Sequence, residues 1–150
     1  MPGVKFIFVQ RPNIKPVKLT LDQVRELTQF ADDLMDRRVD TAGPINIFGE
    51  PRPALSEEYA KRKVKEFGGR PVRDMRRTGQ TLAAKQVYGE MENESTVSAF
   101  VGIRGKDLQK RALWAQNVDP WFGLTDAEES QVRVRGFAMF AKNVADAGGK

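Results

Sequence analysis

The sequence predicts an α+β fold in which a small antiparallel sheet packs against two longer helices, with an extended loop or arm. Three observations lead to this prediction: short runs of β-branched and aromatic residues, two long segments with apolar residues at helical spacing, and no regular alternation of strands and helices. A chain of 150 residues can bury most of its apolar surface in one core. We therefore expect residues 1–150 to form a single domain.

The first two expected elements are a strand and a long helix. Residues 4–9, Val-Lys-Phe-Ile-Phe-Val, have strand composition, and a proline-containing segment ends them. Thr20 and Gln23 form a capping box, and apolar residues then recur at helical spacing over 21–35. The opposite face of this helix is expected to be solvated and carries Asp22, Arg25, Glu26, Asp32, Asp33, Asp36 and Arg37.

A long loop and a second helix follow. Residues 40–55 hold five glycines and prolines, and loops of this length in a compact domain are usually functional or mobile. The loop also contains Ile45, Ile47 and Phe48, which either fold back onto the core or form a docking arm in an assembly. Ser56 is expected to cap a helix over 57–67, which Gly68 and Gly69 end.

A hairpin and two more helices complete the prediction. Residues 84–91 and 95–103 have strand composition and flank a polar turn. A short helix is expected over 105–117, followed by an extended segment over 118–124.

The C-terminal helix is predicted to begin at a second capping box, formed by Thr125 and Glu128. Residues 148–150 are expected to form a flexible tail. The apolar stripe expected on this helix consists of Val132, Phe137, Phe140, Ala141 and Val144.

The composition excludes several classes of enzyme. The chain has no histidine and no cysteine, so it cannot form an imidazole or thiolate zinc site, a disulfide, a cysteine nucleophile or a Ser-His-Asp triad. A carboxylate metal site, a lysine Schiff base and a carboxylate-pair glycosidase remain open. The apolar run at 4–9 is too short for a signal peptide or a membrane helix, so we expect no membrane partner.

Two acidic groups have the residue types of a metal site. Glu90, Glu92 and Glu94 alternate along a strand end and could share one face, but an exposed hairpin tip is the preferred interpretation. Asp32 and Asp33 diverge by about 100° on a helix, which favours solvated charge. We expect no catalytic residue, no cofactor and no metal site.

The excess positive charge lies in one segment. Residues 52–77 contain nine basic and four acidic side chains, while the rest of the chain has 16 of each and is neutral. This segment is either a solvated helix face or a surface for an anionic partner, which would be a nucleic acid or an acidic protein surface. Only Tyr59 and Phe67 supply aromatic rings there, which is few for a nucleic-acid site.

Three segments resemble a pattern found in tailed-phage morphogenesis proteins. Residues 55–63 (Leu-Ser-Glu-Glu-Tyr-Ala-Lys-Arg-Lys) resemble the family's "leu-ser, tyr, lys-x-lys" helix. Residues 68–82, with Thr78-Gly79-Gln80-Thr81-Leu82, resemble the "thr-gly-x-x-leu" turn that leads into a β-hairpin. Residues 120–128 resemble the "phe-x-gly-leu-thr/ser-asp" entry to the C-terminal helix. Together the resemblance covers about residues 55–145.

This resemblance implies a neck or tail-completion protein with no catalytic site. Such a subunit forms a ring at the head-proximal end of the tail or at the connector and helps to join the tail to the head. The implied partners are other copies in the ring and neighbouring neck, connector or tail-tube proteins. The implied location is the neck or tail of the virion, and the host cytoplasm during assembly.

A head-to-tail ring needs two different complementary faces on each subunit. We expect the basic segment to meet the acidic helix, where Asp32, Asp33, Asp36 and Asp40 lie. Trp121 and Phe122, close to Trp114, are the expected aromatic anchors, with core packing as the other use of at least one tryptophan. The full set of expected interaction residues is Arg52, Lys61, Arg62, Lys63, Lys65, Arg70, Arg73, Arg76, Arg77, Ile45, Ile47, Phe48, Trp121 and Phe122.

Two alternatives remain open at this point. The first is a small basic nucleic-acid-binding protein that uses residues 52–77, whose affinity would fall with salt. The second is a carboxylate-metal enzyme. A nucleic-acid-binding protein would contact DNA through the basic segment. A neck protein could use the same segment for a secondary, non-specific contact with DNA.

Overall fold

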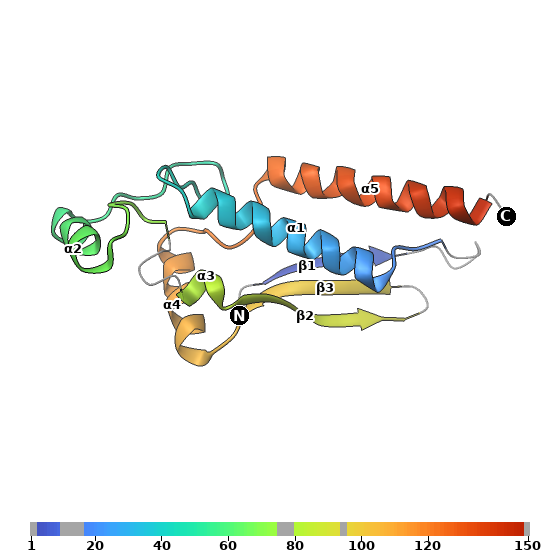
Figure 1. The fold of residues 1–150 in the computed structure, drawn as a ribbon, viewed down its shortest axis with the longest axis horizontal. Helices are drawn as coiled ribbons and strands as arrows, with labels where there is room; N and C mark the ends of the chain where they lie inside the picture. The colour runs from blue at the N-terminus through green and yellow to red at the C-terminus, as the bar shows by residue number, and fades with distance from the viewer. Residues whose placement is uncertain (1–2, 10–16, 75–79, 94–95, 149–150) are drawn as a thin grey trace.

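The chain folds as an α+β protein, which confirms the predicted class (Figure 1). The computed structural model describes residues 3–9, 17–74, 80–93 and 96–148. A three-stranded antiparallel sheet lies under two long helices, α1 and α5, which are on the same side of it. The elements in chain order are β1 (Val4–Val9), α1 (Leu21–Val39), α2 (Glu57–Phe67), α3 (Gln80–Ala83), β2 (Lys85–Glu92), β3 (Thr96–Ile103), α4 (Lys106–Val118) and α5 (Asp126–Gly148).

The sheet has the strand order β1-β3-β2, so the second strand of the hairpin lies in the middle. The predicted hairpin is confirmed, and Asn93 and Thr96 close its turn through the Asn93 N–H to the Thr96 carbonyl (2.9 Å). The register of β2 against β3 shifts between Tyr88 and Met91. Gly89, at a φ of +68°, makes this irregularity possible, since φ values in this region favour glycine.

The helix boundaries follow the caps that the sequence predicts. Thr20 and Gln23 form both hydrogen bonds of a capping box at the start of α1. Ser56 accepts a hydrogen bond from the N–H of Tyr59 at the start of α2, and Gly68, at a φ of +63°, ends that helix. These boundaries are predictable because caps are local features.

The C-terminal helix begins as predicted but ends later. Thr125 Oγ1 accepts from the N–H of Glu128 (3.2 Å), and the Glu128 side chain accepts from the N–H of Thr125 (2.8 Å). Helix α5 continues through Gly148, so the expected flexible tail does not begin there. Residues 149–150 lie outside the described part of the chain, as do Thr78 and Gly79 of the predicted turn; α3 begins directly after them.

The core consists of two apolar clusters above the sheet. One joins α1 and α5 to β3 and includes Leu27, Val97 and Val132. The other joins α1, β3 and α4 and includes Ile103 and Trp121. Both α1 and β3 contribute to the two clusters, so these two elements join the halves of the core.

Candidate interaction surface

The exposed face of α2 carries several of the basic residues of the segment 52–77. Acidic side chains of the same helix partly balance their charge. Lys61 Nζ lies 2.6 Å from Glu57, and Arg62 Nε lies 3.6 Å from Glu66. Lys65 is also exposed. Pairs of this kind, one turn apart on a solvated helix, contribute only a few tenths of a kcal/mol. The face is therefore basic but less charged than the sequence count suggests.

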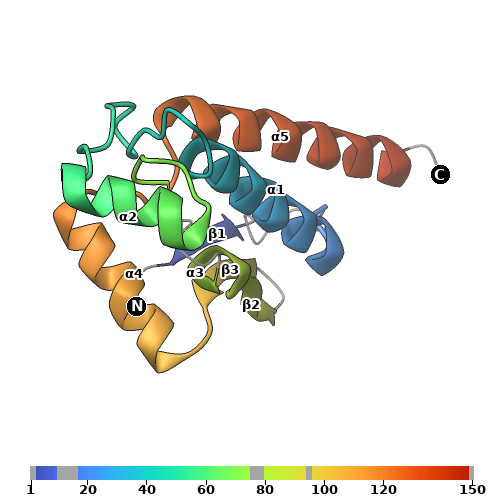
Figure 2. The ribbon, with the colours of Figure 1, turned by 60° about the vertical axis from the view of Figure 1, so that its left-hand side comes forward.

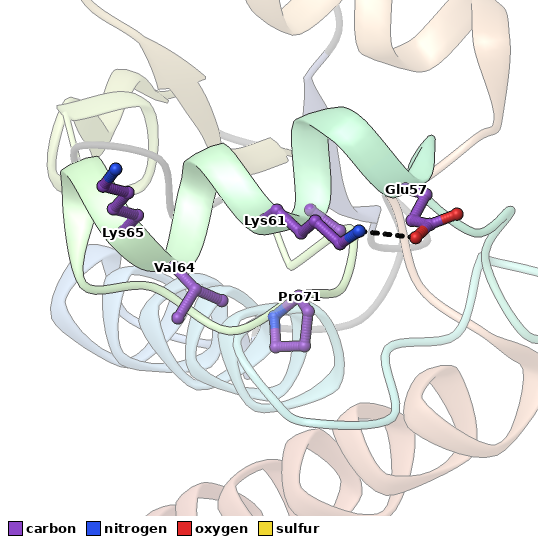
Figure 3. A pocket seen from close by; sticks show the side chains of 6 residues that line it. Glu57, Lys61, Val64, Lys65 and Pro71 are labelled. Atoms are coloured by element: carbon purple, nitrogen blue, oxygen red, sulfur yellow. Dashed lines mark hydrogen bonds and ion pairs between the residues drawn. The ribbon is translucent and has the colours of Figure 1, made fainter.

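A shallow open pocket of about 360 Å³ lies beside α2 (Figure 3). Its lining consists of Glu57, Ala60, Lys61, Val64, Lys65 and Pro71. Figure 3 shows Lys61 directed along the helix toward Glu57, so the carboxylate in the lining already has a cationic partner. The remaining lining is aliphatic apart from Lys65, and we assign no ligand or reaction to this pocket.

Lys63 does not lie on the exposed face, which corrects its expected role as a docking residue. Its side chain is buried and forms an ion pair with Asp74, and it also donates to the carbonyl of Val72 (2.7 Å). This contact holds the segment after α2 against the helix. Removing one partner of a buried ion pair leaves an uncompensated charge, so Lys63 is a structural residue.

Arg52 is a second correction. Its side chain is fully buried; Nε donates to Asp119 Oδ2 (3.1 Å) and Nη1 donates to the carbonyl of Arg73 (3.0 Å). Burial lowers the pKa of Arg52 from its ordinary value, and the hydrogen bond to Asp119 opposes that effect. Arg52 thus connects the long loop with the end of α4 and is not available to a partner.

The other expected basic contacts divide into three groups. Arg70 is exposed and lies 3.1 Å from Asp40 of the segment after α1 and 3.5 Å from Asp74. Arg73 is half-buried and donates to the carbonyl of Pro53 (3.1 Å). Arg76 and Arg77 lie outside the described residues. Of the described cations in the segment, those that a partner could reach are Lys61, Arg62 and Lys65 on α2, together with Arg70.

The long loop is folded back onto the body, which decides between the two alternatives left open for it. Ile45 pairs with Pro51, and the N–H of Ile47 donates to the carbonyl of Pro120 (3.0 Å). The side chain of Asn46 donates to Asp119 Oδ1 (3.1 Å), and its oxygen accepts from the N–H of Phe48 (2.9 Å). Ile45 and Ile47 are half-buried, and Phe48 at the tip is exposed. The predicted arm is therefore a tied loop with one exposed ring.

Trp121 and Phe122, the expected interface anchors, lie instead in the core. Both are buried in the cluster under α4, with their rings in an edge-to-face arrangement at 5.2 Å. Trp121 Nε1 donates to the carbonyl of Ala112 (3.3 Å), so the indole N–H has a partner. Trp121 therefore has the other expected use of a tryptophan, which is core packing.

Arg38 of α1 holds the segment that enters α5. It forms a buried ion pair with Glu128 and donates to the carbonyls of Trp121 and Gly123. Glu128 is also the capping-box residue of α5, so one carboxylate joins the start of α5 to α1. Burial lowers the pKa of Arg38, and Glu128 opposes this shift. No local pattern indicates this contact, because its partners are 90 residues apart.

The acidic face of α1 is less available than expected. Asp32 is buried rather than solvated, and Lys85 of β2 forms ion pairs with both Asp32 and Asp36. Burial raises the pKa of Asp32, while Lys85 opposes this. Asp40 lies beside Arg70 of the same chain. Of the four acidic residues expected to meet a neighbour, three are therefore within ion-pair distance of cations in their own chain.

The glutamates on β2 pair with lysine and arginine. Arg25 makes two contacts with Glu90 (2.5 and 2.7 Å), and Lys18 lies 3.2 Å from Glu92. The hydrogen bond from Arg25 lowers the pKa of Glu90. Glu94 lies outside the described residues. Among the residues that the structure places, no group of three or more acidic side chains is arranged to hold a metal ion.

Most of the large apolar side chains that are exposed lie on two helices from which the expected interaction set took no residue. On α4, Leu113, Trp114 and Val118 are exposed. On α5, the residues of the predicted apolar stripe divide into two groups: Val132 is buried, whereas Phe137, Phe140 and Val144 are exposed. The exposed set also includes Val134 of α5, Phe48, Val64 of α2 and Met91 of β2.

Helix geometry explains why only part of the predicted stripe on α5 is buried. The core face runs through Glu128, Val132 and Gly136, which are buried. Phe137 and Val144 lie roughly 120–140° around the helix from Val132. Phe137 and Val144 thus belong to a second, exposed apolar face. The sequence indicates such a face, since α5 has more large apolar residues than one core-facing stripe can contain.

Comparisons with protein-family models, with curated proteins and with solved structures find no match for this chain. Among the helices that the structure describes, none combines the length and the apolar character that crossing a bilayer requires.

Proposed function

We propose that the chain is a structural virion protein of a tailed phage, a ring-forming neck or tail-completion subunit that helps to join the tail to the head connector. The observation that carries the proposal is the order of elements over residues 55–145. A capped helix, α2, comes first, the short helix α3 and a β-hairpin follow, and α4 and a capped C-terminal helix, α5, come last. The resemblance to the phage family implies α2, the hairpin and α5 in this order, and α4 is an element beyond that pattern.

The local roles of the motif residues support the same proposal. Ser56 and Gly68 begin and end α2, and Thr125 caps α5. Trp121 and Phe122 pack into the core at the entry to α5. These residues direct chain folding, which is what short structural motifs in a non-enzymatic subunit would do.

Exposed apolar surface is the second support. Monomeric proteins rarely leave large contiguous apolar patches in water. Here α4 and α5 each expose several large apolar side chains. A subunit that functions within an assembly would cover them with neighbouring proteins.

The nucleic-acid alternative receives less support from the geometry. Arg52 and Lys63 are buried, and Lys61 and Arg62 lie beside acidic residues of their own helix. Fewer cations are thus free to release counterions from a phosphate backbone than the sequence count suggests.

Locating the protein in particles tests the proposal. A copy with an N-terminal affinity tag is expressed in the host during growth of the phage that encodes it, and purified particles are labelled with gold. We expect label at the junction of head and tail, and unjoined heads and tails when the gene is silenced. Particles without label, from cells that contain the tagged protein, would refute the proposal. A DNA titration at two salt concentrations tests the alternative, which predicts affinity that falls steeply with salt.

A further inference from the structure

Two separate apolar faces remain exposed on this chain. The first, here the α5 face, consists of Val134, Phe137, Phe140 and Val144, which are 70%, 71%, 41% and 45% exposed. The second, here the α4 face, consists of Leu113, Trp114 and Val118, which are 48%, 63% and 46% exposed.

The α5 face has no charged residue between Phe137 and Val144, and Arg133, which is exposed and paired with Glu129, lies at its N-terminal end. Ala138, Ala141 and Ala145 fill the positions between its large side chains and are exposed too. The charged residues of this part of the helix, Arg135, Lys142 and Asp146, fall together on one edge at 100° per residue. The whole outward side of the second half of α5 is therefore apolar.

The two faces lie far apart on the molecule. Figures 1 and 2 show α4 at one end and the C-terminal half of α5 at the opposite end. They cannot cover each other within one chain. Two different faces at opposite ends are what a head-to-tail contact between identical subunits requires.

We propose that the α5 face of one subunit packs against the α4 face of a second copy of this chain. This inference rests on the proposed function, whose ring needs a heterologous contact, and it names the two surfaces. A twofold contact between α5 faces would leave every α4 face uncovered. The head-to-tail contact covers both faces of each subunit with one kind of interface.

The area that such a contact would bury can be estimated from the exposed fractions. Taking roughly 200 Å² for a phenylalanine and roughly 250 Å² for a tryptophan, the exposed parts of Phe137, Phe140 and Trp114 amount to about 380 Å². The four half-exposed aliphatic residues add about 200 Å², at roughly 100 Å² per fully buried side chain.

About 600 Å² of apolar surface, in an interface core that is typically about 65% apolar, corresponds to roughly 900 Å² in total. Stable interfaces usually bury about 1,200 Å² or more. One contact should therefore be weak in solution, and ring closure or a preformed template would supply the missing affinity. This replaces the expected charge-driven contact between the basic segment and α1, whose residues are largely paired within the chain.

Crosslinking tests the contact directly, because the chain contains no cysteine and every thiol is an introduced one. Ala141→Cys places a thiol on the α5 face, and Asn117→Cys places one beside Trp114; both positions are exposed. One variant carries a size tag, and the mixture is treated with a short bis-maleimide. We expect the mixed dimer to be at least several-fold more abundant than either self-crosslinked dimer.

Charge substitutions on the anchors complete the test. Phe137→Glu in the Ala141→Cys chain should abolish the mixed product, whereas the matched control Lys142→Glu, on the charged edge of α5, should retain it. A dominant self-crosslink of the Ala141→Cys chain would show a twofold contact and overturn the inference. A mixed yield no higher than that obtained when Ala83→Cys, at an exposed position of α3, replaces Asn117→Cys would overturn it as well.

Crosslinking tests the interface and particle labelling tests the proposed function, so either hypothesis can be refuted without the other. Label at the head-tail junction without the mixed crosslink leaves the proposed function in place and refutes this interface. A mixed crosslink without label in particles supports the interface and refutes the virion role.

Discussion

The contact between Arg52 and Asp119 leads to the sharpest prediction about stability. Asp119 accepts hydrogen bonds from Arg52 Nε and from the side chain of Asn46, both at 3.1 Å. These two bonds hold the loop that carries Phe48 against the end of α4. Replacing Asp119 by alanine would leave a fully buried guanidinium without its carboxylate.

The size of the effect follows from the burial of this pair. Breaking a buried ion pair by removing one partner costs about 3–5 kcal/mol. Arg52 keeps its hydrogen bond to the carbonyl of Arg73, so we expect a loss near the lower limit, about 3 kcal/mol. At about 2–4 °C per kcal/mol for a chain of this size, Tm should fall by about 6–12 °C.

Urea denaturation followed by circular dichroism measures this loss. Asp146→Ala is the matched control, since Asp146 is exposed on α5, and it should stay within about 0.5 kcal/mol of the unsubstituted protein. The double variant Arg52→Met with Asp119→Ala should be more stable than Asp119→Ala alone, because no buried charge remains. A loss below about 1 kcal/mol for Asp119→Ala, or a double variant less stable than that single one, would refute the reasoning.

Three further predictions concern charge, pH and backbone geometry. Lys63→Glu should destabilise the fold by about 3 kcal/mol or more, whereas Lys61→Glu on the exposed side of α2 should change it by less than about 1 kcal/mol; equal effects in urea melts would contradict the burial assignment. The pKa of Asp32 beside Lys85 is raised by burial, so the folded state holds that proton more tightly than the unfolded chain. The contribution of Asp32 to the free energy of unfolding should therefore decrease as pH rises above about 4, and Asp32→Asn should show a shallower slope there in melts at several pH values. Gly89→Ala should cost about 2–4 kcal/mol, because its φ is +68° and a Cβ would overlap the ring of Phe100 on β3; a thermal melt like that of the unsubstituted protein would exclude this geometry.

The sequence predicted those parts of the fold that depend on neighbouring residues. Capping boxes at Thr20 and Thr125, and the glycine stop after α2, involve groups within a few positions of one another. Strand composition on both sides of a polar turn placed the hairpin for the same reason. These signals act over one turn or one strand pair and need no knowledge of tertiary packing.

The interaction surface was harder to predict because it depends on contacts that are distant in sequence. Arg52 and Asp119 are 67 positions apart, and Lys85 and Asp32 are 53 apart, so the sequence could not indicate which charged residues are buried. The sequence left open which of the tryptophans would be a core residue and which an interface anchor, and the neighbours of Trp121 place it in the core. On α5, two apolar arcs competed for the core, and packing against α1 selected the one that contains Val132.

The distribution of charge and apolar surface yields a prediction that separates two modes of assembly. Contacts between exposed charges weaken as the Debye length falls from about 30 Å at 0.01 M to about 3 Å at 1 M salt. Contacts between apolar faces do not weaken in this way, and strongly excluded salts strengthen them. The mixed crosslink between the Asn117→Cys and Ala141→Cys chains should therefore keep its yield, or gain, as the sulfate concentration rises. A yield that falls severalfold over the same range, and is restored when the salt is diluted before the crosslinker is added, would instead assign the subunit contact to the exposed cations of α2. That result would exclude the apolar faces as the main source of affinity.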